Sequence, residues 1–599
     1  MRIKWFSLVR ITGLIMVLAY HFYPKQVTGG FVGVDLFFVF SGFLITSLMI
    51  DEFAKQSHFD LLAFYRRRFN RIVPPLWFSV TLVLPLSLLI NRDFLTNIGK
   101  QVAAAFGFVT NYYEILTGGN YENQFTPHLF VHTWTLALEM HFYILWGLLV
   151  WFLVQYVKRS RFNRIDRTDL LRLRIGQLSA VFILIQLAVI YLQIQQGINL
   201  NVIYFADVTH AFPFFIGALV ASLTGIRQLP NYFKHVLGRT SAGGAMTGML
   251  LGLALLAGLT ALLKFDQPIT YQWGFLLASL GAALMIVSAR ILHDKTPSIE
   301  EPRLITFLAD TSYSVYLYHW PLIIIFGHLI NHDLAVLLTI SLSLALSALS
   351  YYVIEPMLTH PKIKPFWHRS ALALMTILAG ITFVICWQAP KLSNLSQHLW
   401  QGNLQQDVDQ LHSLADNTAT QTGHNRQIPK GISVIGDSVT LGTRTYLATH
   451  LVDSSIDAQP NRNMTQANQV LEEQIRNKTL RQNVIICIGT NSLNDYQEQL
   501  MKLIQTLPKG HRLILMTPFD GQANAGWNSS KLTVLERTLP DKYPFITIAD
   551  WNRLAGQHRE IFGSGDGTHF AGNADGDKLY AQCLNDALAK AEKGPVKNK

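Results

Sequence analysis

Long apolar runs, each close to the length that crosses a lipid bilayer, recur through the first two thirds of this 599-residue chain. A helix needs about 20 mainly apolar residues to span the hydrocarbon core. Runs of this kind cover residues 30–50, 76–90, 134–156, 178–192, 246–263, 273–292 and 335–354. Only 15% of the chain is charged, which is less than in ordinary soluble proteins. The sequence therefore predicts a multi-span α-helical membrane domain over residues 1–390 and a water-soluble domain after it.

Basic residues are concentrated in every second loop between these runs, as the positive-inside rule expects of cytoplasmic loops. The alternation fits eleven spans, at residues 8–24, 30–50, 75–91, 133–156, 175–194, 203–224, 243–263, 271–291, 307–327, 334–355 and 370–389. The apolar segment 102–109 is short, so we expect it not to cross. An odd number of spans with a cytoplasmic N-terminus puts the C-terminal domain outside the cell. We therefore expect a multi-pass plasma-membrane protein.

Charge and cysteine content exclude several classes of protein. The net charge is +11, but the basic clusters follow the topology, and we find no nucleic-acid-binding motif. Cys386, Cys487 and Cys583 show no metal-ligand spacing, so neither a disulfide framework nor a metal site is expected. The first apolar stretch contains Arg10 and His21 and lacks a small-residue cleavage site, which argues against a cleaved signal peptide.

The polar part of the chain has two sections. Residues 391–430 are rich in Asn, Gln, Ser, Thr and Asp, which predicts a linker. In residues 431–599 short apolar strands alternate with helical segments, which predicts an α/β domain with a parallel sheet. Ligands of such sheets bind at the carboxyl ends of the strands.

Three short motifs fall at or near predicted strand ends. They contain Ser438, Asn491 and the pair Asp566 and His569. A serine becomes a nucleophile when a base takes its proton and an acid orients that base, so we expect Ser438, His569 and Asp566 to fill these roles. The Asn491 amide and the Ser438 backbone N–H can donate to an oxyanion. Either GDS or DxxH alone is often an ordinary turn or helix cap, but the three motifs in this order indicate a catalytic site.

These motifs resemble those of the SGNH hydrolase family over roughly residues 430–593. The GDSV block matches at Ser438, the GxN block at Gly489 and Asn491, and the DxxH block at Asp566 and His569. The resemblance implies a further oxyanion donor, a glycine N–H in the second block. Asn461 stands in that position here, and its N–H can serve if its backbone adopts a suitable conformation, because Asn tolerates the left-handed region well.

Charged residues within the predicted spans are candidates for function, because they are costly to bury in a bilayer. Arg10 and His21 share the first span and are eleven residues apart, so they lie on one helix face about 16 Å apart. The outer half of the domain is expected to gather His21, Asp35, His132 and Glu139. The inner side is expected to gather Arg10, Arg67, Arg68 and Arg71.

The basic inner side suits a donor rich in phosphate, and a histidine with acids suits acyl or proton transfer. Alternative interpretations stay open. The arginines at 66–71 could be a topology signal alone, and Glu355, Tyr318 and His319 could be packing polar groups.

Residues 5–357 resemble the acyltransferase-3 family of integral membrane acyltransferases. The matching stretches are Arg10-x10-His21, the run 33–43 (GVDLFFVFSGF), Arg67-Arg68-x-x-Arg71, His132-x-Trp134-Thr135-Leu136-x-x-Glu139, the run 313–321 (YSVYLYHWP) and Glu355-Pro356. Thr135 departs from the serine that is common there. The resemblance implies acyl-CoA donors and, often, surface glycan acceptors.

The combination of these two domains in one chain is similar to the peptidoglycan O-acetyltransferases of Gram-positive bacteria. They imply acetyl-CoA as donor, an acetyl ester on Ser438, a peptidoglycan hydroxyl (the C6 hydroxyl of muramic acid first) as acceptor, and no tightly bound cofactor. Other hypotheses are another surface or secreted polysaccharide as acceptor, a membrane-anchored acetyl esterase, and a transporter or scaffold with a vestigial triad. How acetyl crosses the bilayer, through Tyr318, His319 or a tyrosine relay, is left open by the spacing.

Overall fold

The computed structural model describes residues 3–24, 26–90, 92–117, 128–161, 164–359, 365–391, 401, 406, 428–493, 495–521, 523, 526–562, 567–570 and 572–598. The chain forms two compact units, Met1–Ala389 and Pro390–Lys599. The predicted Asp566 lies outside the described residues.

Helices make up all the regular structure described in the first unit. The long helices are α1 (Phe6–Phe22), α2 (Gly33–Gln56), α3 (Leu61–Val83), α6 (Trp134–Lys158), α7 (Arg164–Gln195), α10 (Phe212–Thr224), α12 (Ala242–Leu262), α13 (Phe275–Lys295), α14 (Arg303–Leu329), α15 (His332–Leu349) and α17 (Pro365–Gln388). The short α-helices are α4 (Ile98–Phe106), α5 (Thr110–Thr117), α8 (Leu200–Phe205), α9 (Asp207–His210), α11 (Asn231–Arg239) and α16 (Glu355–Thr359). Short 3-10 and π segments are η1 (Gly30–Val32), η2 (Leu84–Leu89), η3 (Arg92–Leu95), η4 (Val131–Thr133), η5 (Thr270–Gly274) and η6 (Ser350–Ile354).

Seven helices among the described residues are long and apolar enough to cross a bilayer, and three shorter helices are also apolar. Each predicted span coincides with helical structure, so the prediction of a multi-span helical domain is confirmed. The number of eleven crossings and their direction stay predictions. Segment 102–109 falls largely in α4, whose nine residues rise only about 14 Å, too little to span a membrane.

The predicted span 203–224 is not one continuous helix. Its backbone is interrupted between α8 and α9 at Ala206, which is extended, and again before α10, where Pro213 lies in the first turn. The Tyr204 carbonyl accepts a hydrogen bond from Nδ1 of His210 at 2.7 Å. A break at membrane depth is tolerated where the freed polar groups are buried and satisfied within the protein.

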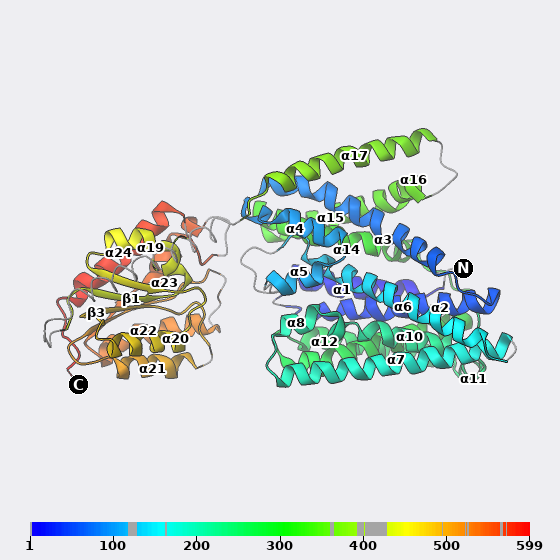
Figure 1. Ribbon diagram of the computed structural model, residues 1–599, viewed down its shortest axis with the longest axis horizontal. Helices are drawn as coiled ribbons and strands as arrows, with labels where there is room; N and C mark the ends of the chain where they lie inside the picture. Colours follow the sequence, from blue (N-terminus) through cyan, green and yellow to red (C-terminus); the bar gives the residue numbers. More distant parts are fainter. Residues whose placement is uncertain are drawn as a thin grey trace. The chain divides into compact units, whose positions relative to one another are not determined.

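Two glycines bring α2 and α10 side by side (Figure 1). A Cβ atom at Gly42 would lie 2.0 Å from the Phe214 carbonyl oxygen, and one at Gly217 would lie 2.0 Å from the Val39 carbonyl oxygen. Small residues allow such close backbone approach between membrane helices. This contact holds α2, which carries Asp35 and Ser41, against the broken α8–α10 segment.

The second unit is a parallel five-stranded sheet in the order β2-β1-β3-β4-β5, which confirms the predicted α/β fold. The strands are β1 (Ile432–Gly436), β2 (Ser454–Ala458), β3 (Asn483–Cys487), β4 (Arg512–Met516) and β5 (Ile546–Ala549). The helical segments are α19 (Ser438–His450), α20 (Met464–Arg476), α21 (Tyr496–Thr506), α22 (Asn528–Lys542), α23 (Trp551–Gln557), η7 (Arg559–Phe562) and α24 (Ala574–Ala591).

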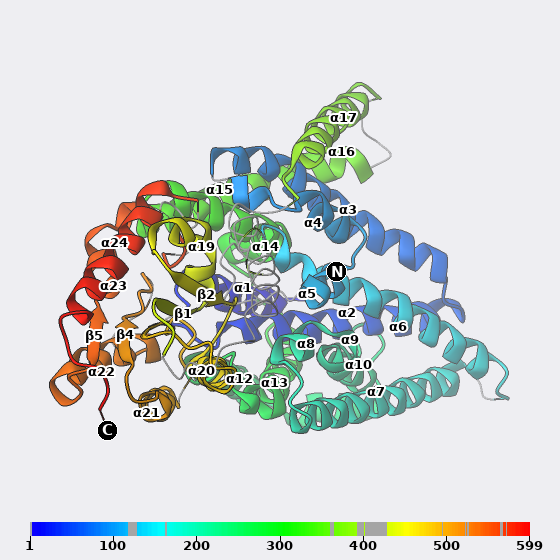
Figure 2. The same cartoon turned by 60° about the vertical axis from the view of Figure 1, so that its left-hand side comes forward.

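The helices cover both faces of this sheet. Helices α19, α23 and α24 pack on one face and α20, α21 and α22 on the other (Figures 1 and 2). Neighbouring strand residues point to opposite faces, so Val434 joins the first core and Ile435 the second. The buried sheet fixes the positions of the loops at its carboxyl end.

Candidate functional site

A serine and a histidine meet at the carboxyl end of the sheet in the second unit. Ser438 begins α19 directly after β1, and its side chain is buried. His569 lies between η7 and α24, and its Nε2 is 2.7 Å from Oγ of Ser438. At this distance Nε2 can accept the hydroxyl proton, which is the arrangement that activates a nucleophile. The residues predicted as nucleophile and base are therefore in direct contact.

Asp437 links two loops at this site, a role that the sequence did not suggest. One carboxylate oxygen accepts from the Val439 N–H at 3.0 Å, capping α19, and the other accepts from Oγ1 of Thr490 at 3.0 Å. Burial raises the pKa of Asp437, and the hydrogen bonds from Thr490 and Val439 partly offset this effect. The turn before Ser438 is thereby tied to the loop that carries Asn491.

The two asparagines predicted as oxyanion donors lie on loops that follow β2 and β3. Asn461 has φ 58°, in the left-handed region that glycine favours and asparagine tolerates. Asn491 is half-buried and follows Gly489, where a Cβ atom would lie 2.5 Å from Cγ of Pro518. Glycine is therefore required at 489 for the close packing of this loop.

Arg462 joins the Asn461 loop to the end of β1. Its buried guanidinium donates to the Asp457 carboxylate at 2.6 Å and carbonyl at 2.7 Å, and to the Gly436 carbonyl at 3.2 Å. Gly436 is two residues before Ser438. Arg462 directly follows Asn461 in the chain, but nothing in the sequence indicated this contact.

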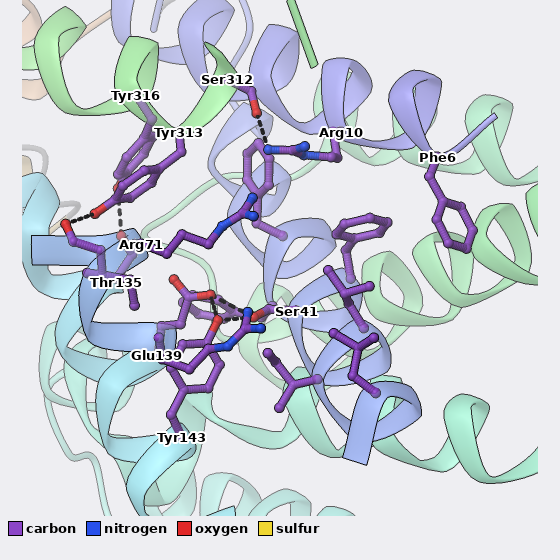
Figure 3. A pocket seen from close by; sticks show the side chains of 18 of the residues that line it. Phe6, Arg10, Ser41, Arg71, Thr135, Glu139, Tyr143, Ser312, Tyr313 and Tyr316 are labelled. Carbon is purple, nitrogen blue, oxygen red and sulfur yellow. Dashed lines mark hydrogen bonds between the residues drawn. The ribbon is translucent and has the colours of Figure 1, made fainter. Parts of the chain in front are cut away.

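A cavity of about 430 Å³ opens within the first unit, between α1, α2, α3, α6 and α14 (Figure 3). Its apolar lining includes Phe6, Phe37, Phe40, Leu44 and Ile45. Its charged lining consists of Arg10, Arg68, Arg71, Arg227, Glu139 and Asp310. The cavity thus joins an apolar wall to four cations and two acids.

Several polar side chains in the cavity are linked by hydrogen bonds (Figure 3). Oγ of Ser41 lies 2.6 Å from Oε1 of Glu139 and 2.6 Å from the Tyr143 hydroxyl, which also donates to Glu139. Arg10 donates to Oγ of Ser312 at 3.1 Å. Ser41 and Glu139 belong to the motifs that carry the resemblance, whereas Tyr143 was not singled out from the sequence.

The structure separates the predicted arginine cluster. Arg68 and Arg71 line the cavity, but Arg67 does not; it is half exposed and pairs with Glu52 at 2.9 Å. Residues three apart share a helix face, whereas adjacent residues do not, which explains the difference. Arg227, counted in the sequence only as part of a basic loop, also reaches the cavity.

Three histidines gather around α14. Nδ1 of His21 lies 2.7 Å from Nε2 of His319, and Nδ1 of His319 lies 2.6 Å from the Tyr316 carbonyl oxygen. The His132 ring is centred 6.1 Å from that of His319, and its Nε2 lies 3.1 Å from the Leu317 carbonyl oxygen. His319, which the spacing left open beside Tyr318 for the path of acetyl across the bilayer, is thus in direct contact with His21.

Asp35 and Glu139 do not join these histidines, so the expected cluster of four groups is corrected. Asp35 is fully buried and contacts Nε2 of His210 at 3.3 Å. Glu139 is in the cavity. The first turn of α2 faces the broken α8–α10 segment, and Glu139 is about two helical turns from His132.

Within the described ranges, His, Cys, Asp and Glu nowhere form a group of three that could hold a metal ion. Cys386, Cys487 and Cys583 carry free thiols. Burial raises the pKa of both Cys487 and Cys583 to about 12, so these two stay protonated near neutral pH.

Comparisons with known proteins show similarity to acyltransferases. The acyltransferase-3 family model, described as an acyltransferase domain, matches residues 3–387. The chain is 24% identical to the O-acetyltransferase OatA of Staphylococcus aureus, over 99% of this chain and 96% of that protein. It is also 24% identical to the peptidoglycan O-acetyltransferase OatA of Listeria monocytogenes, over 97% of both. The solved C-terminal catalytic domain of Streptococcus pneumoniae OatA, with a methylsulfonyl adduct, is 37% identical over 29% of this chain and all of that one, with a TM-score of 0.28.

Proposed function

The chain belongs to the acyltransferase-3 family and is an acyltransferase, and from this premise we propose that it transfers acetyl groups from cytosolic acetyl-CoA to a hydroxyl of peptidoglycan. The observation that carries the proposal is the 2.7 Å contact between Ser438 and His569 in a chain whose first unit is a multi-span acyltransferase domain. Peptidoglycan as acceptor is supported by the similarity to the peptidoglycan O-acetyltransferase of Listeria, which matches along nearly its whole length.

In the second unit, Oγ of Ser438 attacks the acetyl carbonyl carbon while His569 takes the hydroxyl proton. The bond to the acyl carrier breaks and His569 returns the proton to the leaving group. A sugar hydroxyl then attacks acetyl-Ser438, gives its proton to His569, and Ser438 recovers it. Asp566 orients His569, and the Asn491 amide with the N–H groups of Ser438 and Asn461 stabilises the oxyanion of each tetrahedral intermediate.

In the first unit, the cavity is the proposed donor site. Arg68, Arg71 and Arg10 supply positive charge for the phosphates of acetyl-CoA, since guanidinium groups bind phosphate well. The apolar wall accommodates the uncharged pantetheine arm. His21 is the proposed base of the transfer within the membrane. Asp35, His132 and Glu139 are the other polar groups proposed to take part in this transfer within the first unit.

The orientation that the basic loops predict completes the proposal. With the N-terminus in the cytoplasm, the donor cavity faces acetyl-CoA and the second unit faces the cell wall. The C6 hydroxyl of muramic acid is the proposed acceptor.

The proposal is tested by expressing the full chain in a Gram-positive host that lacks its own wall O-acetylation. Mass spectrometry of muropeptides should detect O-acetyl muramic acid with the natural chain and with Ser455→Ala, a change at an exposed serine of β2. Ser438→Ala should abolish it. Unchanged acetylation in Ser438→Ala would refute the role of Ser438. Acetyl groups on another glycan would show that peptidoglycan is not the acceptor. A net loss of acetyl groups from the wall, when the chain is expressed in a host that does O-acetylate its wall, would show hydrolysis in place of transfer.

A further inference from the structure

We propose that His319 is a positioning residue that fixes which ring nitrogen of His21 carries the proton. The contact between their rings joins α1 to α14 across 298 positions of sequence. The consequence for catalysis rests on the proposed function, in which His21 is the base of acyl transfer in the membrane.

The hydrogen bonds determine the proton positions one after another. A carbonyl oxygen can only accept, so Nδ1 of His319, at 2.6 Å from the Tyr316 carbonyl oxygen, must carry a hydrogen. In a neutral imidazole the other nitrogen is then an acceptor. Nε2 of His319 therefore accepts from Nδ1 of His21 at 2.7 Å, so His21 carries its hydrogen on Nδ1.

The same reasoning leaves a lone pair on Nε2 of His21. This nitrogen can take a proton from a reacting hydroxyl and later return it to a leaving group. The positive charge that His21 acquires meanwhile is stabilised by its Nδ1–H bond to His319, which itself gains and loses no proton. His319 thus acts on His21 as an orienting acid acts on the histidine of a serine-type site.

Burial and geometry keep this pair in a single arrangement. His319 is fully buried, and its ring plane lies within 14° of that of His21. The 2.7 Å between the nitrogens is much shorter than the 5.0 Å between ring centroids, so the rings meet at their edges. Trp320 also packs against His21, with its ring centred 4.7 Å from that of His21.

Two substitutions of His319 distinguish a role in positioning the proton of His21 from a role in folding. His319→Phe fills the space but removes the acceptor, whereas His319→Gln offers an amide oxygen near the position of Nε2. We expect His319→Phe to lower kcat for acetyl transfer from acetyl-CoA by about 10²–10⁴-fold with little change in KM for the donor, because a wrongly placed proton costs up to about 10⁴-fold. His319→Gln should recover most of that loss.

The matched control is His328→Phe in the same helix. His328 also donates from Nδ1 to a backbone carbonyl, that of Ile324 at 2.7 Å. This variant should keep the natural rate when the full-length chain is assayed in lipid nanodiscs. Equal loss in His319→Phe and His319→Gln, or a change confined to KM, would overturn the positioning role.

A spectroscopic measurement decides the tautomer without reference to activity. In full-length protein labelled with ¹⁵N-histidine, the signals that disappear in His21→Ala should belong to a protonated Nδ1 and an unprotonated Nε2. His319→Phe should shift this pattern towards Nε2–H. A natural chain with Nε2–H at His21 would refute the inference. A His21→Ala protein with full activity would refute the proposed function of His21 instead, whatever the spectrum shows.

Discussion

Oγ of Ser438 and Nε2 of His569 lie 2.7 Å apart, although 131 positions of sequence separate them. The contact arises because the helices that begin near these two residues pack on the same face of the sheet. Helix α19 begins at Ser438 and packs beside α24, which begins shortly after His569. The Thr440 hydroxyl of α19 lies 2.9 Å from the Tyr580 hydroxyl of α24, which holds the two helices together. The distance between nucleophile and base is therefore set by the buried contact between these two helices.

Loss of His569 should slow the covalent labelling of Ser438 and leave the protein folded. We expect His569→Ala to lower the rate at which a sulfonyl fluoride labels Ser438 by about 10²–10⁴-fold, since a positioned base contributes that much. Intact-mass spectrometry of the full chain measures the labelled fraction with time. His450→Ala, at an exposed histidine that ends α19, is the control and should label at the natural rate. Equal rates in all three proteins would exclude His569 as the base.

The backbone at Asn461 should decide how well residue 461 can be replaced. A left-handed backbone costs an L-residue other than asparagine or glycine about 1–2 kcal/mol, or roughly tenfold for each 1.4 kcal/mol. We expect kcat for hydrolysis of an aryl acetate by the full chain to be kept in Asn461→Gly and to fall about tenfold in Asn461→Val.

Asp453 provides a matched control for strain alone. It has φ 53°, close to that of Asn461, but precedes β2 at the opposite end of the strand. Asp453→Val should lower the thermal midpoint and leave kcat of the folded protein unchanged. If Asn461→Val keeps its natural kcat, the Asn461 N–H does not contribute to the oxyanion site.

The sequence predicted the second unit well because parallel sheets gather strand ends at one edge. Motifs that follow β1 and β3 must then lie close together, and Ser438 and Asn491 were found from this rule. Contacts made by common residue types could not be found in this way. The bonds from Arg462 to Asp457 and Gly436 involve one arginine among many, and nothing in its spacing distinguishes it.

The membrane unit was predicted less completely, because apolar length shows where a span lies but not which face it buries. The spacing of Arg10 and His21 correctly put both on α1. It could not show that Arg10 reaches Ser312 while His21 reaches His319, since both partners lie on α14, some 300 positions away. The break between α8 and α10, which brings His210 to Asp35, was hidden inside one apolar run.

Adjacent arginines on α3 should differ in their effect on the donor. Arg68 lines the cavity, whereas Arg67 pairs with Glu52 at the surface. A hydrogen bond to a charged group contributes about 1.5–3 kcal/mol, so Arg68→Ala should raise KM for acetyl-CoA about tenfold or more. Arg67 does not line the cavity, and its exposed ion pair contributes only about 0–1 kcal/mol to stability. Arg67→Ala should therefore change KM for acetyl-CoA little. Steady-state assays of full-length protein in nanodiscs measure both, and equal effects would argue against the cavity as the donor site.

A buried acid in the second unit should make its stability depend on pH. Glu536 of α22 is buried, and its Oε2 has no hydrogen-bond partner among the residues that the structure describes. Burial raises the pKa of Glu536 well above its usual value, and the charge of Asp550 raises it further. The folded state therefore holds this proton more tightly than the unfolded state does. The stabilisation is complete below the unfolded pKa and is lost as pH rises through the folded pKa.

Glu536→Gln, which stays neutral, should consequently raise the thermal midpoint of the second unit by a few degrees at about pH 8 and by less at about pH 5. Proteolysis of the heated full-length chain, followed by mass spectrometry of peptides from residues 431–598, reports the midpoint of this unit alone. Glu473→Gln, at an exposed acid of α20, is the control and should leave the midpoint unchanged at both pH values. If Glu536→Gln lowers the midpoint at about pH 8, the carboxylate is stabilising in the folded state, and the raised pKa of Glu536 is contradicted.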